Sequence, residues 1–157
     1  EINQAALRVT RQTESMYWRL MTQTTRDGLQ EALATWQESG LGERGLPDLI
    51  DSLEPLFGRE RAKRIGVTET TRVFAEGNRE AMAQDETVIG EEWQTAEDEL
   101  VCSLCGPLDG KIHPKGQGPA LPLHVNCRCS VQPATARYVR ANPDRWQGPA
   151  LPAEEVA

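Results

Sequence analysis

The chain has 157 residues, which is room for one domain or for one domain with an appendage. Only 38% of the residues are hydrophobic, and 24 acidic against 17 basic residues give a formal net charge of −7. This acidity argues against a dedicated nucleic-acid binder, although not against a local basic face. No apolar run approaches the roughly 20 residues of a membrane-spanning helix, so we expect no transmembrane segment. The first residues, Glu1-Ile2, lack the features of a signal peptide. Because the chain has no initiator Met, we expect a fragment of a longer protein.

The N-terminal segment has the apolar spacing of one helix face. Ile2, Ala6 and Val9 begin a series at steps of three and four residues, and the series resumes after Gly28 until Gly40 ends it. The spacing predicts one long or once-broken helix over about 3–38, within a helical arm at 1–45. Because the apolar stripe is thin, its partner is either a neighbouring helix of the same chain or another chain.

Two further helices are expected after the Gly-rich turn. The first is a short helix that begins at Pro47, which is favourable in a first turn, and it has a strong apolar face; Pro55 should end or bend it. The second runs from about 59 to 84. Its first turns are basic and carry Arg59, Arg61, Lys63 and Arg64.

Glu69 falls on the apolar side of the helix expected at 59–84. A carboxylate that faces a core must be paired or protonated, because an isolated buried charge is too costly. Arg72 and the basic residues at 59–64 are candidate partners, which favours a structural ion pair. The alternative is a catalytic carboxylate.

The pattern changes after residue 86. Residues 87–90, 93–95 and 129–132 have the composition of strands, and Asp109-Gly110 is a dipeptide typical of a tight turn. From Pro133 onward we expect an extended, Pro-rich tail. The fold class is therefore α+β: a helical arm at 1–45, a helical and small β-hairpin domain at 46–133, and a tail at 134–157.

Two other features stand out in this half of the chain. The acidic residues between Asp85 and Glu99 are most simply a solvated face. The hexamer QGPALP occurs at 117–122 and again at 147–152, and it is either a shared extended docking segment or a coincidence.

All four cysteines fall within 28 residues, together with a histidine. The spacing is C-x2-C, then H-x2-C-x-C, formed by Cys102, Cys105, His124, Cys127 and Cys129. Structural Zn²⁺ takes four Cys or His ligands in a tetrahedron, and C-x2-C supplies two of them from one tight turn. Cys127 and Cys129 would share a face if they lie on a strand. Five candidates compete for four places, with His113 a weaker sixth, and the pattern favours structural zinc.

Other chemistry is compatible with four cysteines. Two disulfides would suit a secreted protein. Cys102-x-x-Cys105 could be a redox pair, but it does not follow a strand and open a helix. A catalytic zinc would keep an open position and a nearby general base, whereas this cluster has enough ligands to close its shell.

The ordered residues resemble the Mu F-like phage head-morphogenesis family of minor capsid proteins over about residues 59–133. The resemblance is carried by a basic helix with Ile65 and Thr68-Glu69 and then by a series of motifs in the same order: Trp93-Gln94-Thr95, Asp98, Val101-Cys102-x-x-Cys105, Leu108-Asp109-Gly110 and His124-x-x-Cys127-Arg128-Cys129. It implies a minor head protein of a tailed phage or prophage. Such a protein acts in head assembly or DNA retention near the portal, in the virion head and, during assembly, in the host cytoplasm.

The resemblance also implies partners and roles. The portal, the major capsid protein or both would be partners, packaged double-stranded DNA is a further candidate, and no membrane is involved. Glu69, Arg72, Trp93, Asp98 and Arg128 would have structural or partner-contact roles. We expect a non-enzymatic protein with a structural Zn²⁺.

Two alternatives stay open. One is a DNA-binding zinc module of the packaging machinery that uses the basic helix and Arg128; its binding would depend steeply on salt. The other is a hydrolase or transferase domain that uses Glu69, Asp98 and His124. The sequence contains no Gly-rich phosphate loop and no H-E-x-x-H helix, which disfavours this second alternative.

Overall fold

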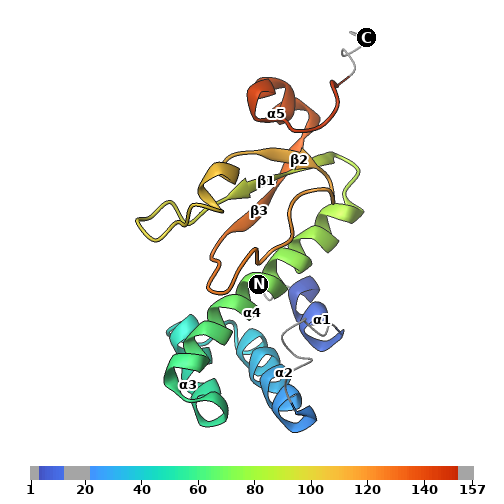
Figure 1. Cartoon of the computed structure of the whole chain (residues 1–157). Helices are drawn as coiled ribbons and strands as arrows, with labels where there is room; N and C mark the ends of the chain where they lie inside the picture. Colours follow the sequence, from blue (N-terminus) through green and yellow to red (C-terminus); the bar gives the residue numbers. More distant parts are fainter. Residues whose placement is uncertain (1–3, 13–21, 152–157) are drawn as a thin grey trace. The chain divides into compact units, whose positions relative to one another are not determined.

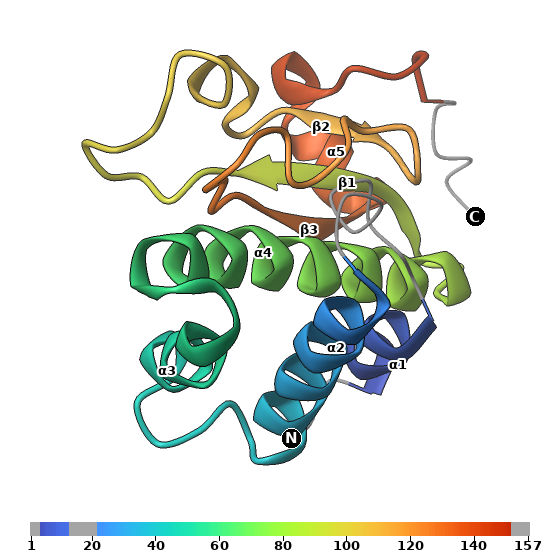
Figure 2. The same cartoon turned by 60° about the horizontal axis from the view of Figure 1, so that its bottom comes forward.

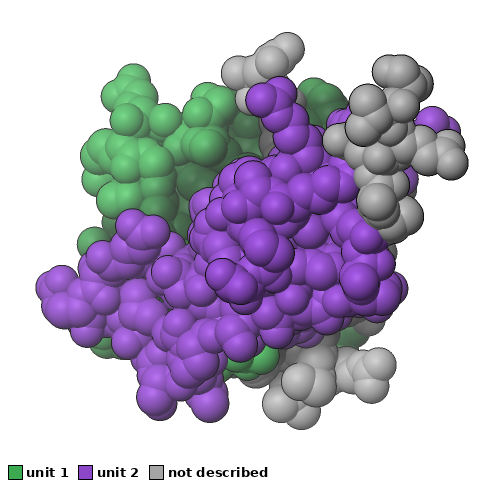
Figure 3. Space-filling model, turned by 90° about the horizontal axis from the view of Figure 1, so that it is seen from above, with its two compact units in different colours: residues 1–78, 121–128 green, residues 79–120, 129–157 purple. Residues whose placement is uncertain are grey.

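The computed structural model describes residues 4–12 and 22–151 and has the expected α+β fold (Figure 1). The chain forms two compact units. A helical unit comprises residues 1–78 and 121–128, and a sheet unit comprises residues 79–120 and 129–157 (Figure 3). Within the described parts, none of the helices combines the length and apolar character needed to cross a membrane.

The helical unit contains the helices of the first half of the chain: α1 (Gln4–Gln12), α2 (Gln23–Glu38), α3 (Leu46–Phe57) and the part of α4 (Arg59–Gln84) up to Asn78. The predicted start of α3 at Pro47 and the predicted bounds of α4 are confirmed. The α3 helix does not end at Pro55: it continues to Phe57 and is followed by Gly58, whose φ is +72°. The missing N–H of Pro55 costs the helix one backbone hydrogen bond, the one to the Asp51 carbonyl, and the helix ends within a turn of it.

The N-terminal segment forms two helices where the spacing predicted one long or once-broken helix. Residues 13–21, in the middle of that prediction, lie outside the described residues. The α2 helix begins after Thr22, whose side chain accepts from the Thr25 N–H. Gln30 donates to the Thr10 carbonyl at 3.0 Å and Gln37 to the Thr10 hydroxyl at 2.8 Å, so α1 and α2 bind each other (Figure 2). Of the two partners expected for the thin apolar stripe, a neighbouring helix of the same chain is present.

The core of the helical unit is apolar. Leu29 and Leu33 of α2 are fully buried with Leu49 and Leu53 of α3, and Trp36 and Ala62 complete the cluster. Burying each large aliphatic side chain stabilises the fold by roughly 1.5–3 kcal/mol. The α1 helix approaches α4 closely, since a Cβ at Gly77 would lie 2.5 Å from the Ala6 nitrogen. Only glycine fits at that crossing.

The sheet unit is built on three antiparallel strands in the order β2-β1-β3: β1 (Val88–Gln94), β2 (Ile112–Pro114) and β3 (Ser130–Thr135) (Figure 1). The strand signals at 87–95 and 129–132 are confirmed as β1 and β3, whereas β2 was not predicted. Gly110, with φ +68°, donates its N–H to the Trp93 carbonyl and leads into β2. The predicted turn at Asp109-Gly110 therefore starts the return strand.

The tail differs from the extended segment that the sequence predicts. Residues Ala136–Ala141 form α5, capped by the Thr135 hydroxyl, and Pro143–Arg145 form the 3₁₀ helix η3. Val139 of α5 is buried with Ile112 and Ala134 in a small apolar cluster. The Ala- and Arg-rich composition is compatible with a short helix once a cap is available. Proline content alone was a poor guide to this segment.

The two copies of the repeated hexamer both lie against their own chain. Leu121 of the first copy is buried, and Leu151 of the second packs against the cluster around Ile112. The segment before Leu151 also pairs with β2, because the Gln147 N–H donates to the Ile112 carbonyl at 2.8 Å. In this structure the hexamers serve as internal packing segments.

Candidate metal centre

The first two cysteines lie on a tight turn that follows β1. The Gly106 N–H donates to the Cys102 carbonyl at 2.9 Å, and the Cys105 N–H lies 3.4 Å from Sγ of Cys102. Pro107 then continues the chain as the 3₁₀ helix η2 (Gly106–Leu108). An amide N–H directed at sulfur favours the thiolate over the thiol, and the thiolate is the form that binds metals.

The second pair of ligand candidates lies on a loop fixed to α4. The Cys127 N–H donates to the His124 carbonyl at 3.1 Å, and Asn126, between them, has a φ of +63°. Thr68 and Thr71 of α4 hold this loop: the Thr68 hydroxyl accepts from the Asn126 N–H at 3.0 Å, and the Thr71 hydroxyl donates to the Cys127 carbonyl at 2.5 Å. The Thr68-Glu69 motif thus positions the loop that carries His124 and Cys127.

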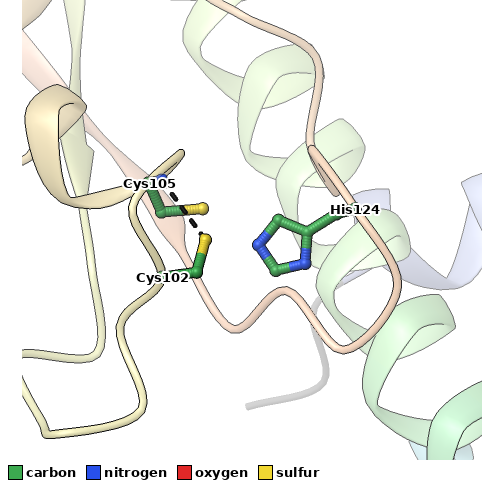
Figure 4. A group of neighbouring side chains, drawn as sticks. All are labelled: Cys102, Cys105 and His124. Atoms are coloured by element: carbon green, nitrogen blue, oxygen red, sulfur yellow. Dashed lines mark hydrogen bonds between the residues drawn. The ribbon is translucent and has the colours of Figure 1, made fainter.

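The ligand atoms of the five candidates come together in two overlapping groups. Cys102, Cys105 and His124 form one group, and Cys105, Cys127 and Cys129 form the other; within each group the ligand atoms lie within 4.8 Å of one another. Figure 4 shows the His124 ring turned toward Cys102 and Cys105. Cys105, Cys127 and Cys129 are buried, whereas Cys102 and His124 are half-buried. Cys105 is the residue that belongs to both groups.

Each group of three could hold a metal ion, and its Cys and His donors are of the types that zinc takes. In a tetrahedral site with Zn–S bonds near 2.3 Å, two sulfurs lie about 3.8 Å apart, so separations up to 4.8 Å need only a small contraction. Nδ1 of His124 lies 2.8 Å from the Val125 carbonyl oxygen. When Nδ1 carries the proton and donates it to that oxygen, Nε2 is left as the metal-binding nitrogen. The hydrogen bond at Nδ1 orients the His124 ring, as is usual for histidines that bind a metal.

The alternatives for the cysteines separate on this geometry. None of the four cysteines is in a disulfide, whereas the sequence allowed two. Cys127 and Cys129 precede β3, which begins at Ser130, so they converge through the loop rather than through a shared strand face. The Cys/His cluster can hold a metal ion. His113 belongs to neither of the two groups.

The other residues singled out from the sequence have structural contacts. Glu69 and Arg72 are both buried and paired at 2.7 Å, so the expected ion pair is present. Trp93 is 1% exposed in β1 opposite Val131. Asp98 accepts from the Leu100 N–H at 3.0 Å in the loop before Cys102. Arg128 is exposed, between two buried cysteines.

Sequence reasoning missed two buried carboxylates in β1. Glu91 and Glu92 belong to the acidic stretch interpreted as a solvated face, yet they are 1% and 5% exposed. Arg79 of α4 donates to both carboxylate oxygens of Glu91, at 2.8 and 2.9 Å, and Gly118 adds a backbone N–H at 2.9 Å. Arg145 of η3 pairs with Glu92. The sequence did contain a signal for this. Glu91 and Glu92 lie in a strand-like run that leads to Trp93, and when such a strand is central in its sheet neither of its faces is open to solvent.

Two more side chains organise this region. The Asp109 carboxylate accepts from both the backbone N–H and the hydroxyl of Thr95, at 2.8 and 2.9 Å, and so closes the loop between β1 and β2. Nε2 of His113 is buried with no hydrogen-bond partner among residues 4–12 and 22–151. Burial lowers the pKa of His113 below its usual 6.5, and Glu91 opposes this effect only in part. The ring is therefore neutral at pH 7.

Comparison with known proteins finds no match for this chain. The chain matches no protein-family model, no curated protein and no solved structure.

Proposed function

We propose that the chain is a structural minor head protein of a tailed phage or prophage, which acts in head assembly near the portal and is stabilised by a zinc ion. The observation that carries the proposal is the convergence of the Cys/His cluster from the two ends of the ordered motif series. That series is the one on which the resemblance to the Mu F-like head-morphogenesis family rests. Two contacts join members of this series: the Thr68 hydroxyl accepts from the loop that carries His124, and the Asp109 carboxylate accepts from Thr95.

The metal would be held by Cys102, Cys105 and two of His124, Cys127 and Cys129. Zinc bound there would supply four strong bonds that cross-link the loop after β1 to the chain entering β3. A small β unit needs such bonds because its apolar packing alone provides little stability. The protein's own part is to place the ligands. The C-x2-C turn directs a backbone N–H at one sulfur, and the Val125 carbonyl orients the His124 ring.

A role in assembly without catalysis is supported by how the candidate catalytic residues are used. Glu69 is buried and paired with the Arg72 guanidinium at 2.7 Å, so its carboxylate already has a charged partner. Asp98 caps a turn of its own loop, and His124 points to the cysteines (Figure 4). Each residue of the hydrolase alternative thus already has a structural contact.

The DNA-binding alternative is weakened by the pairing at the start of α4. Arg59 bridges Asp51 and Glu54 at 2.6 and 2.7 Å, and Lys63 pairs with Glu60 at 2.8 Å. Half of the four basic residues in this stretch are therefore neutralised by acids of the same unit. A phosphate-binding stripe would keep its cations available for the backbone of DNA.

The test is to look for the chain in purified particles. We expect quantitative mass spectrometry of virions from the phage or induced prophage that carries the gene to find the protein in few copies relative to the major capsid protein. Complementation of a gene deletion with the Cys105→Ser variant should leave heads that do not assemble or do not retain DNA. Ser103→Ala, a change at an exposed position on the same turn, is the matched control and should complement fully.

Two results would contradict the proposal. One is absence of the chain from particles of normal composition. The other is normal head assembly and DNA retention by a deletion strain. Tight binding of the purified chain to double-stranded DNA with a steep salt dependence would instead support the packaging-module alternative.

A further inference from the structure

The loop between β1 and the C-x2-C turn combines acidic and exposed apolar residues. We call residues 96–104 the leucine loop. Leu100 and Leu104 are 71% and 62% exposed, the largest exposures among the big apolar side chains of the described residues. Glu97, Asp98 and Glu99 precede them, and no basic residue occurs between Gln94 and Lys111. The loop projects from the end of β1 (Figures 1 and 2).

The leucine loop is held in shape at both ends. Thr95 is fixed by the Asp109 carboxylate, and the backbone N–H groups of Leu100 and Val101 donate to the side chain and the carbonyl of Asp98. The C-x2-C turn closes the other end. A loop with this many internal bonds loses little conformational freedom when a partner covers it, so its two leucines are suited to binding.

A surface of complementary character is present on the helical unit, at the junction of α3 and α4. Leu56 is 47% exposed there, and the Arg61 guanidinium lies 5.5 Å from the centre of the Phe57 ring. Within residues 4–12 and 22–151, Arg61 and Arg64 form no ion pair, unlike Arg59 and Lys63. We call Leu56, Phe57, Arg61 and Arg64 the arginine patch. It offers apolar surface bordered by two positive charges.

We propose that the leucine loop of one copy of this chain binds the arginine patch of a second copy. Two leucines would cover the exposed Leu56 and the half-buried Phe57, and Glu97 and Glu99 would face Arg61 and Arg64. The contact joins two different surfaces, so it is heterologous and can propagate from copy to copy. It rests on the charge and apolar complementarity of the two surfaces and does not depend on the phage function.

The experiment is sedimentation velocity on the zinc-loaded full chain, at about 0.05 M and about 0.5 M salt. We expect concentration-dependent association at low salt. Two double variants, Glu97→Lys/Glu99→Lys and Arg61→Glu/Arg64→Glu, should each weaken the association about 10-fold or more, because attraction at the border becomes repulsion. Mixing the two variants should restore association, since each then carries the charge that the other lacks.

Glu43→Lys/Glu86→Lys makes the same change of net charge as Glu97→Lys/Glu99→Lys, at exposed positions outside both surfaces, and should leave association unchanged. Leu100→Ser/Leu104→Ser should abolish association without altering the charge. A chain that stays monomeric at the highest soluble concentration would overturn the proposal. Association that survives both charge reversals, or that mixing does not restore, would overturn it equally.

Discussion

The helical unit buries six apolar side chains in one cluster, whereas the cluster around Ile112 in the sheet unit has three buried members among the described residues. The sheet unit buries two carboxylates, those of Glu91 and Glu92, and the described part of the helical unit buries one, that of Glu69. Apolar packing tolerates small errors in position because it is not directional. Buried ion pairs stabilise only when every partner is in place.

We expect the two units to lose their structure in response to different kinds of mutation. The helical unit should keep its structure through changes that leave its apolar volume intact. The sheet unit should depend on a few specific bonds: those of its cysteines in the Cys/His cluster (Cys102, Cys105 and Cys129) and those of Arg79 and Arg145 to the two glutamates. The following changes test this difference in order of expected effect.

The largest effect should come from loss of the metal ligands. Cys105→Ser, or a chelator added to the natural chain, should unfold the sheet unit and leave the helices largely formed, because Cys105 is shared by both ligand groups. Amide NMR spectra are the measurement: dispersed signals of β1 and β3 should collapse while those of α2 and α3 persist. Ser103→Ala is the control. Complete loss of the helical signal would contradict the division between the two units.

A smaller loss should follow from breaking the Arg79–Glu91 pair. Glu91→Leu leaves a guanidinium without its carboxylate and should lower the free energy of unfolding of the sheet unit by about 3 kcal/mol. The double variant Arg79→Met/Glu91→Leu should recover most of that loss, because no buried charge is left unpaired. Chemical denaturation monitored by NMR separates the two units. Glu86→Leu, at an exposed site, serves as the control, and a single variant as stable as the natural chain would show that the pair contributes nothing.

In the helical unit, two glycines of α4 should respond in opposite directions. Gly77→Ala places a Cβ 2.5 Å from the Ala6 nitrogen and should destabilise the unit by about 1–3 kcal/mol. At Gly66 the nearest atom would be the flexible Ile50 side chain at 3.3 Å, so alanine there should be neutral or stabilising by up to about 1 kcal/mol. Thermal unfolding of the two variants measures the contrast. Equal melting temperatures would mean that α1 does not pack closely on α4.

The smallest effect is expected at the cap of α5. Thr135→Ala removes the hydroxyl that accepts from the Tyr138 N–H at 3.3 Å and should cost about 1 kcal/mol. Thr135→Ser keeps the acceptor and should restore the stability. Hydrogen exchange of the α5 amides reads the effect locally. Identical protection in the alanine and serine variants would show that packing of Val139, and not the cap, holds this helix.

Local patterns predicted much of the fold. The start of α3 and the bounds of α4 follow from the first-turn Pro47, the apolar spacing and the composition of 59–84, all of which are properties of neighbouring residues. The Cys/His cluster was also recognisable, because C-x2-C and H-x2-C-x-C restrict chemistry through spacing alone. The contact that Thr71 makes with Cys127 could not be predicted, since 56 residues separate the two.

The misses have physical reasons as well. The three-residue strand β2 is too short to show an alternating pattern, and it is defined by pairing with β1. Glu91 and Glu92 were interpreted as solvated because their partners, Arg79 and Arg145, are 12 and 53 residues away in sequence. In each case a distant partner, invisible in the local pattern, decides the environment.

The most direct test of the account is the metal content of the natural chain. Elemental mass spectrometry on protein purified without added metal, together with a thiol titration, measures zinc and free sulfhydryls on the same sample. If the Cys/His cluster holds a structural zinc, we expect about one zinc per chain and four thiols that react only after a chelator is added. A metal-free chain with four reactive thiols, or one with two disulfides, would contradict it.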